Sequence, residues 1–162
     1  MSESKDFVKE LFVSFFFVGK SPVAPGTFGS LGALILAYYT FEYFPSTAGY
    51  ILLVSVIGMY YIGLQVAPWC EDKYGKDPGT YVVDEVIGYF IAISFLIIIG
   101  IEFSNMIWGF SFLSFRIFDV LKIWPAKDLE KIEGGHGIIL DDVVAGFQTL
   151  ILVLLVYNFD II

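Results

Sequence analysis

Residues 49–67 read GYILLVSVIGMYYIGLQVA and contain no charged side chain. The segment lies between Pro45 and Pro68, and its length suits a membrane-spanning helix, which needs about 20 predominantly apolar residues. The whole chain has the same character. Of its 162 residues, 57% are hydrophobic and only 16% are charged, whereas soluble domains average about 25% charged residues. The mean hydropathy is +0.79, so we expect much of the surface to face lipid.

Composition also excludes several classes of protein. The net charge of −8 argues against a nucleic-acid partner, which favours a basic surface. The single cysteine, Cys70, can form no internal disulfide and belongs to no zinc-binding pattern. Neither a fixed-period repeat nor a low-complexity linker divides the chain. The sequence therefore predicts a single domain over residues 1–162.

Other apolar segments predict further helices. They cover residues 27–44, 86–101, 106–124 and 143–159. Several are short for a membrane span, so a soluble all-helical domain with apolar core helices is the alternative. We expect an all-α fold, a compact membrane-embedded bundle of about five main apolar helices.

The N-terminal segment is expected to behave differently. Residues 7–18 are too few to cross a bilayer and follow a stretch of mixed charge, which favours a short interfacial helix. The mixed charge, and the lack of a small-residue cleavage site, argue against a secretory signal peptide.

The basic residues give the predicted bundle an orientation. With helices at the positions above, every Lys and Arg falls at one end, whereas the connections around residues 45–48 and 102–105 contain none. Cytoplasmic loops of membrane proteins are enriched in Lys and Arg. We therefore expect the basic end to face the cytoplasm and the C-terminus to lie on the opposite side.

Four polar segments of the sequence lie at this basic end, and two of them carry paired acids. Asp84 and Glu85 precede one apolar helix, and Asp141 and Asp142 precede another. Acids at helix N-termini are ordinary caps. Two adjacent acids beside hydrocarbon are costly, however, unless a divalent cation lies between them. Gly88 lies one turn after Asp84 and leaves room for a ligand or another helix.

The two remaining segments suit a phosphate group. In one, Thr27 or Ser30 can cap a helix whose N-terminal amides, with Lys20 nearby, would bind an anion; a plain loop and cap is the alternative. In the other, Arg116, Asp119 and Lys122 recur every three residues on one helical stripe. This stripe is either a surface ion-pair ladder or a phosphate clamp with one carboxylate for metal or catalysis.

The four polar segments read SPVAPGTFGSL (21–31), DPGTYVVDEVIG (77–88), FRIFDVLKIWP (115–125) and GGHGIILDDVVAG (134–146). In their sequence, order and spacing they resemble the phosphatidylglycerophosphatase A family. The family usually has proline where Ile123 stands, and His136 occupies a variable position of its motif, so we assign His136 no role.

The resemblance implies Mg²⁺-dependent hydrolysis of phosphatidylglycerophosphate to phosphatidylglycerol and inorganic phosphate in the bacterial inner membrane, and the basic residues place the site on the cytoplasmic side. Attack by water and an aspartyl-phosphate intermediate through Asp119 or another acid are both open. A small ion or metal transporter using the same acids is the rival function. The expected catalytic residues are Asp84, Asp119 and Asp142; the expected metal ligands are Asp84, Glu85, Asp141 and Asp142; the expected phosphate-binding residues are Lys20, Thr27, Ser30, Arg116 and Lys122.

Overall fold

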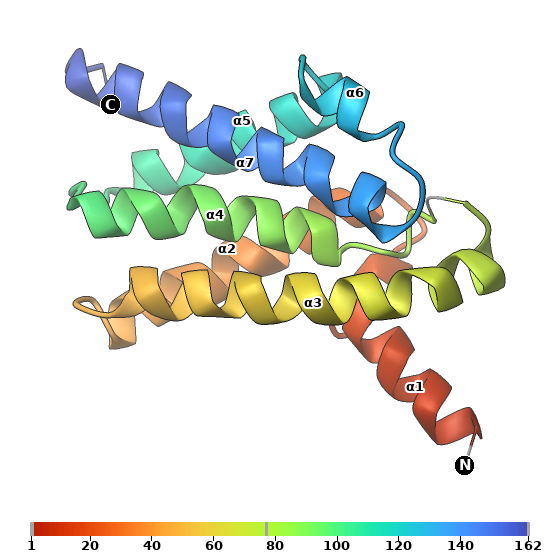
Figure 1. The fold of residues 1–162 in the computed structure, drawn as a ribbon. Coiled ribbons are helices and arrows are strands. Elements are labelled where there is room, and N and C mark those ends of the chain that lie inside the picture. The colour runs from red at the N-terminus through yellow and green to blue at the C-terminus, as the bar shows by residue number, and fades with distance from the viewer. Residues whose placement is uncertain (1, 77, 162) are drawn as a thin grey trace.

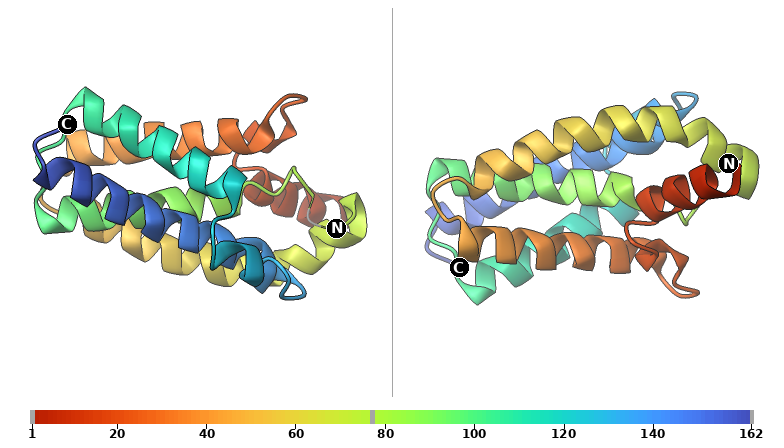
Figure 2. Two further views of the ribbon diagram at one scale, coloured as in Figure 1. Left: turned by 90° about the horizontal axis from the view of Figure 1, so that it is seen from above. Right: turned by 90° about the horizontal axis from the view of Figure 1, so that it is seen from below.

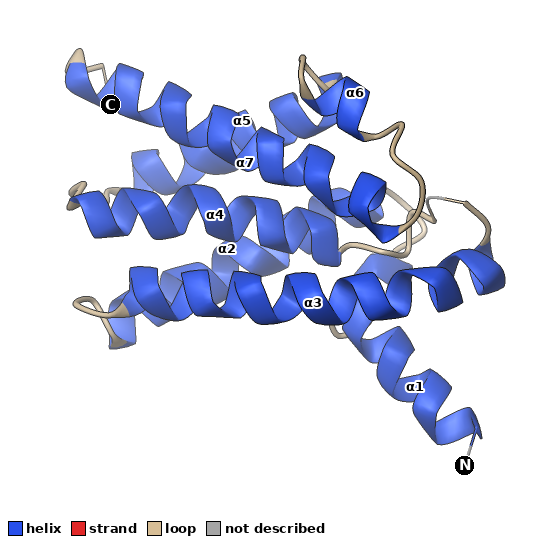
Figure 3. Ribbon diagram, viewed as in Figure 1, coloured by secondary structure: helices blue, strands red, loops and turns tan. Residues whose placement is uncertain are grey.

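The fold is all-helical, as the sequence predicts. The computed structural model describes residues 2–76 and 78–161, and within these it contains helices and no strand (Figures 1 and 3). Asp77, which begins one of the four polar segments, lies outside the described residues. The elements are α1 (Ser2–Val13), the 3-10 helix η1 (Val18–Lys20), α2 (Pro25–Tyr43), α3 (Ala48–Tyr74), α4 (Val83–Ile99), α5 (Asn105–Leu121), α6 (Ala126–Leu129) and α7 (Gly135–Asn158).

Helix α4 is the centre of the bundle. It packs against α2, α3, α5 and α7, and the views in Figure 2 show these helices arranged around it. After its first turn α4 reads VIGYFIAISFLIII, which is apolar on every face. A helix of this kind is stable only when it is buried on all sides. Accordingly, Ile87, Tyr89 and Ile93 are completely inaccessible.

Two glycines bring α4 and α7 into backbone contact. A Cβ on Gly88 would lie 2.4 Å from the carbonyl oxygen of Asp142, and a Cβ on Gly146 would lie 2.2 Å from the carbonyl oxygen of Gly88. No side chain fits in either place, because real Cβ atoms do not approach backbone so closely. The sequence interpretation of Gly88 as room for another helix is consistent with this contact.

The outward faces of the surrounding helices are apolar. Large apolar side chains such as Val54 on α3, Leu113 on α5 and Ile151 on α7 are more than half exposed. Inside the bundle, by contrast, the hydroxyls of Ser111 and Thr149 are buried and donate to carbonyls of their own helices. Two helices, α3 and α7, are long and apolar enough to cross a membrane, and only 28% of the apolar window of α3 is buried.

Helix α1 diverges from the bundle (Figure 1) and is held by polar contacts. The carboxylate of Glu10 accepts hydrogen bonds from Lys73 and from Tyr74 at the end of α3 and forms an ion pair with Lys20 at 2.9 Å. The ammonium of Lys20 and the hydroxyl of Tyr74 lower the pKa of Glu10 to about 2. At its C-terminal end the carbonyl of Val13 accepts from the backbone N–H of Val82 at 2.8 Å.

Two helices extend beyond the predicted limits. Helix α3 continues through Pro68 to Tyr74, because an internal proline removes one backbone hydrogen bond without preventing the following turns. Helix α7 begins at Gly135, not at residue 143. Glycines at positions 134, 135 and 137 are typical of a loop. Here the glycines instead allow close packing, since a Cβ on Gly135 would lie 2.8 Å from Cβ of Ala67.

Candidate functional site

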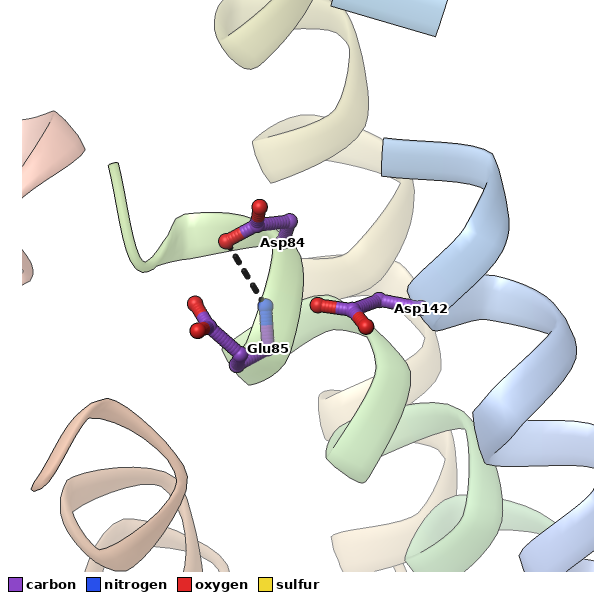
Figure 4. A group of neighbouring side chains, drawn as sticks. All are labelled: Asp84, Glu85 and Asp142. Carbon is purple, nitrogen blue, oxygen red and sulfur yellow. Dashed lines mark hydrogen bonds between the residues drawn. The ribbon is translucent and has the colours of Figure 1, made fainter. Parts of the chain in front are cut away.

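Three acids from two helices meet at the basic end of the bundle. Asp84 and Glu85 lie in the first turn of α4, and Asp142 extends from α7 toward that turn (Figure 4). One carboxylate oxygen from each lies within 4.8 Å of the other two. Asp84 and Asp142 are only 7% and 4% exposed. We refer to Asp84, Glu85 and Asp142 as the acidic triad.

The crossing of α4 and α7 aligns the triad. Asp84 and Asp142 each lie four residues, about one turn, before the glycine of the crossing in their own helix. The contact between Gly88 and Gly146 therefore places the two acids side by side. A hydrogen bond from the backbone N–H of Glu85 to Oδ1 of Asp84, 2.9 Å long, fixes the orientation of the Asp84 carboxylate.

Asp141 is separated from its neighbour Asp142. Successive residues of an α-helix point about 100° apart, so both cannot face α4. Oδ2 of Asp141 lies 2.9 Å from the ammonium of Lys122, which also contacts Glu130 at 2.8 Å. The structure brings three of the four predicted metal ligands together and pairs the fourth, Asp141, with a predicted phosphate ligand.

Arg116 connects three helices beside the triad. Its Nη1 donates to Ser30 Oγ on α2 at 3.1 Å and to the carboxylate of Asp119 one turn along α5. The same nitrogen lies 3.9 Å from Oε1 of Glu85. Through Arg116, the side chains of Ser30 and Asp119 are connected to the edge of the triad at Glu85.

The start of α2 contributes a residue that sequence reasoning did not single out. A Cβ on Gly26 would lie 2.1 Å from Oε1 of Glu85 and 3.3 Å from Nη1 of Arg116. The absence of a side chain here lets α2 approach the carboxylate. Its spacing of one turn from Ser30, on the face that meets α4 and α5, is the signal in the sequence that points to it.

The remaining predicted residues lie outside the triad. Lys20 pairs with Glu10 of α1 at 2.9 Å. Thr27 lies in the first turn of α2, one residue after Gly26, but neither Thr27 nor Ser30 caps the helix, because its N-cap is Ala24 and no side chain forms a cap hydrogen bond there. His136 is exposed in the otherwise buried first turn of α7, and its Nδ1 is 2.8 Å from the hydroxyl of Tyr60.

The electrostatics of the site favour a cation. Asp119 and the triad contribute four carboxylates, against one guanidinium from Arg116, and like charges this close repel strongly in a buried site. Oε2 of Glu85 is buried and has no hydrogen-bond partner among the described residues, although buried polar atoms are normally paired. A set of carboxylate oxygens suits a hard divalent cation such as Mg²⁺.

Comparison with known proteins agrees with the motifs. The family model described as phosphatidylglycerophosphatase A matches residues 11–157. Phosphatidylglycerophosphatase A of Escherichia coli (strain K12) is 35% identical over 131 residues, which cover 79% of this chain and 71% of that protein. The Haemophilus influenzae protein of the same name is 32% identical over 145 residues, 80% and 77% of the two chains.

A third relative has another name. It is a Bacteroides thetaiotaomicron protein, provisionally named a phosphatidylinositol-3-phosphatase, and is 32% identical over 139 residues, 83% of this chain and 84% of that one. No solved structure gives a significant match.

Proposed function

The chain belongs to the phosphatidylglycerophosphatase A family, and on this premise we propose that it hydrolyses phosphatidylglycerophosphate to phosphatidylglycerol and inorganic phosphate. The activity is that of a phosphoric monoester hydrolase. The buried triad beside Arg116 carries the proposal, because it offers oxygen ligands for a metal next to a cation suited to phosphate. A transporter needs acids along a path through the bilayer, whereas these acids form one cluster.

Mg²⁺ is the proposed cofactor, held by Asp84, Glu85 and Asp142. The unpaired Oε2 of Glu85 and the mutual repulsion of the three carboxylates support this assignment. When bound, the metal supplies charge neutralisation of the phosphate and a more acidic water. Asp141 is better suited to hold Lys122 than to bind the metal, since the two side chains are already 2.9 Å apart.

Arg116 and Ser30 are proposed to orient the phosphate. A guanidinium has five N–H donors, and the described contacts of Arg116 all use Nη1. Its remaining donors suit the equatorial phosphate oxygens, on which negative charge is spread in the transition state. Asp119 orients Arg116 through their ion pair, a role that favours attack by water over attack by Asp119 itself. The water oxygen would form a new bond to phosphorus while the bond from phosphorus to the glycerol oxygen breaks. A proton of the water would pass to that glycerol oxygen, so that phosphatidylglycerol leaves as the alcohol together with inorganic phosphate.

We also propose that the bundle is embedded in the bacterial cytoplasmic membrane with the triad on the cytoplasmic side. The apolar outer faces of α2, α3, α5 and α7, with hydroxyls buried inside, are the reverse of a soluble bundle. All Lys and Arg lie toward the end of the bundle where α3 ends and α4 and α7 begin, which favours that end as the cytoplasmic one.

Labelling of single cysteines tests this orientation. In a Cys70→Ala background, we expect an impermeant thiol reagent applied to intact cells to label Ser46→Cys and not Lys73→Cys or Lys127→Cys, because the last two lie at the basic end. Labelling of all three in lysed cells is the control. Labelling of Lys73→Cys or Lys127→Cys in intact cells, without Ser46→Cys, would reverse the orientation.

Replacement of Arg116 tests the phosphate contact. Arg116→Lys keeps the charge but loses the planar fork, and a charge-assisted hydrogen bond is worth about 1.5–3 kcal/mol. We expect kcat/KM to fall roughly 10- to 100-fold, since about 1.4 kcal/mol corresponds to tenfold. Lys131→Arg, at an exposed ion pair with Asp128, should be neutral. Near-normal turnover of Arg116→Lys, with a melting temperature lowered in Arg116→Ala, would assign Arg116 a purely structural role.

A phosphate-release assay tests the function itself. Purified protein in mixed micelles should release phosphate from phosphatidylglycerophosphate with Mg²⁺ and should stop with EDTA. Phosphatidylinositol 3-phosphate is the comparison substrate, because one relative is named as a phosphatase for it. No release from phosphatidylglycerophosphate at any Mg²⁺ concentration would refute the proposal.

A further inference from the structure

An apolar cavity lies between α1 and α3, outside the triad. Its volume is about 350 Å³, and its lining is almost wholly apolar: Val8, Leu11, Phe12, Phe15, Phe16 and Met59. All but Met59 come from α1 and the turn after it. The cavity exists because α1 diverges from the bundle while Glu10 and Val13 hold it at fixed points.

The cavity is linked to the triad through a short rigid segment. The carbonyl of Val13 accepts from the N–H of Val82, two residues before Asp84. Val82 is in turn enclosed by glycines, since a Cβ on Gly19 would lie 2.9 Å, and one on Gly29 2.7 Å, from atoms of the Val82 side chain. The wall of the cavity and the first turn of α4 are therefore parts of one packed unit.

The cavity lies further along the helices than the basic end of the bundle, toward the middle of α3 and α2. Met59 precedes Trp69 by ten residues, about 15 Å along α3. On the other side, Phe15 packs against Gly32, whose Cβ would lie 3.2 Å from the Phe15 ring. Gly32 follows the start of α2 at Pro25 by seven residues, about 10 Å. In the proposed membrane orientation this depth corresponds to hydrocarbon.

Cations lie at the shallower level beside the end of α3. The ammonium groups of Lys9 and Lys73 lie 5.4 Å and 5.0 Å from the ring centre of Trp69. Lys20 and Lys73 both contact the carboxylate of Glu10, and Asp6 and Asp72 lie close to Lys9 and Lys73 along the chain, so the charges here are mixed. Lysines beside aromatic rings are typical of the headgroup level of a membrane, so a phospholipid whose headgroup lies at this level can extend a chain to the depth of the cavity.

We propose that the cavity between α1 and α3 binds an acyl chain of the phospholipid substrate. This inference rests on the proposed function and adds a second point of attachment to it. Because lipid tails are as apolar as the cavity, the chain gains little free energy by moving from the bilayer. Binding of the chain in the cavity would instead hold the headgroup of the same lipid in place beside the triad.

Two substitutions at the cavity test the proposal. Met59→Trp fills it from α3, and Val8→Trp narrows it from α1, where the Val8 side chain is 59% exposed and its replacement should not impair folding. We expect both to lower kcat/KM about tenfold for dioleoyl phosphatidylglycerophosphate, because a displaced phosphate reacts more slowly. The dihexanoyl substrate, whose chains are too short to reach the cavity, should be hydrolysed as by the wild type.

The matched control is Ile62→Trp, an exposed position on α3 that does not line the cavity. Its kinetics should equal those of the wild type with both substrates, and the melting temperatures of all three variants should agree. Equal kinetics for Met59→Trp, Val8→Trp and Ile62→Trp on the dioleoyl substrate would overturn the proposal, as would an equal loss on both substrates.

Crosslinking separates the cavity from the catalytic assignment. Dioleoyl phosphatidylglycerol with a diazirine in its chain should label peptides from α1 in the wild type and label them less in Met59→Trp. Turnover by the wild type without labelling of α1 would refute the chain site while leaving the hydrolase intact. If the wild type releases no phosphate from either substrate, the hydrolase function is refuted. In that case an acyl chain bound in the cavity would not belong to a substrate.

Discussion

Asp142→Asn should lower kcat/KM by at least about a hundredfold, because even residues that only support a metal ligand typically cost 10- to 100-fold. An amide cannot supply the charge that a divalent cation requires at this position. Asp84→Asn should behave in the same way, as both carboxylates belong to the buried triad. Phosphate release over a range of Mg²⁺ concentrations measures the effect, and Mg²⁺ affinity should fall with activity.

The melting temperature distinguishes metal ligands from structural acids. In EDTA the three carboxylates of the triad repel one another, so Asp142→Asn should melt at the same temperature as the wild type or higher. Addition of Mg²⁺ should stabilise the wild type, since a ligand that binds only the folded state raises its stability, and should stabilise the variant much less.

The adjacent residue supplies a matched comparison. Asp141→Asn removes one of the two acids that hold Lys122, so it should melt at a lower temperature while retaining its response to Mg²⁺. His136→Ala removes only an exposed hydrogen bond to Tyr60 and should keep most activity. A loss in His136→Ala as large as that in Asp142→Asn would assign the histidine a general-base role. Identical behaviour of Asp141→Asn and Asp142→Asn would place both acids on the metal.

Gly88→Ala should destabilise the bundle strongly, although it adds only one methyl group. That methyl group would overlap the carbonyl oxygen of Asp142, and Gly146→Ala would overlap that of Gly88. Overpacking of a core typically costs about 1–3 kcal/mol. A clash with backbone on the opposing helix should reach the upper part of that range, about 3 kcal/mol of unfolding free energy. Thermal unfolding in detergent measures the effect.

The activity of Gly88→Ala should fall further than the loss of folded protein explains. Relief of the clash requires α4 and α7 to separate, which moves Asp84 away from Asp142, and a displacement of about 1 Å can cost a hundredfold in rate. The control is Gly109→Ala on α5, where a Cβ meets nothing within 4 Å and alanine favours the helix by up to about 1 kcal/mol. If Gly88→Ala were as stable and active as Gly109→Ala, close backbone contact at the crossing would be wrong.

Several features follow from the sequence alone. The uncharged segment 49–67 and the apolar run after Glu85 predict helices, because their lengths and composition permit no exposed strand or loop. The paired acids and the stripe of Arg116 and Asp119 predict a site at the basic end, since charged groups beside hydrocarbon require partners. These arguments depend on composition and on neighbours within one helix.

The limits of helices were less well determined. Pro68 and the glycines after residue 133 are typical helix breakers, yet α3 passes through the first and α7 includes Gly135 and Gly137. A helix contains such residues when packing against another helix compensates for their poor propensity. That compensation depends on the partner helix, which no local pattern reveals.

Only the tertiary structure decided which charges meet. The sequence treats Asp141 and Asp142 alike, but a rotation of about 100° per residue turns one toward Lys122 and the other toward Asp84. Lys20, a predicted phosphate ligand, pairs with Glu10. Sequence thus determined the helices and the end of the bundle that carries the chemistry. The crossing at Gly88 and Gly146 fixed the rotation of α4 against α7, and with it the members of the triad.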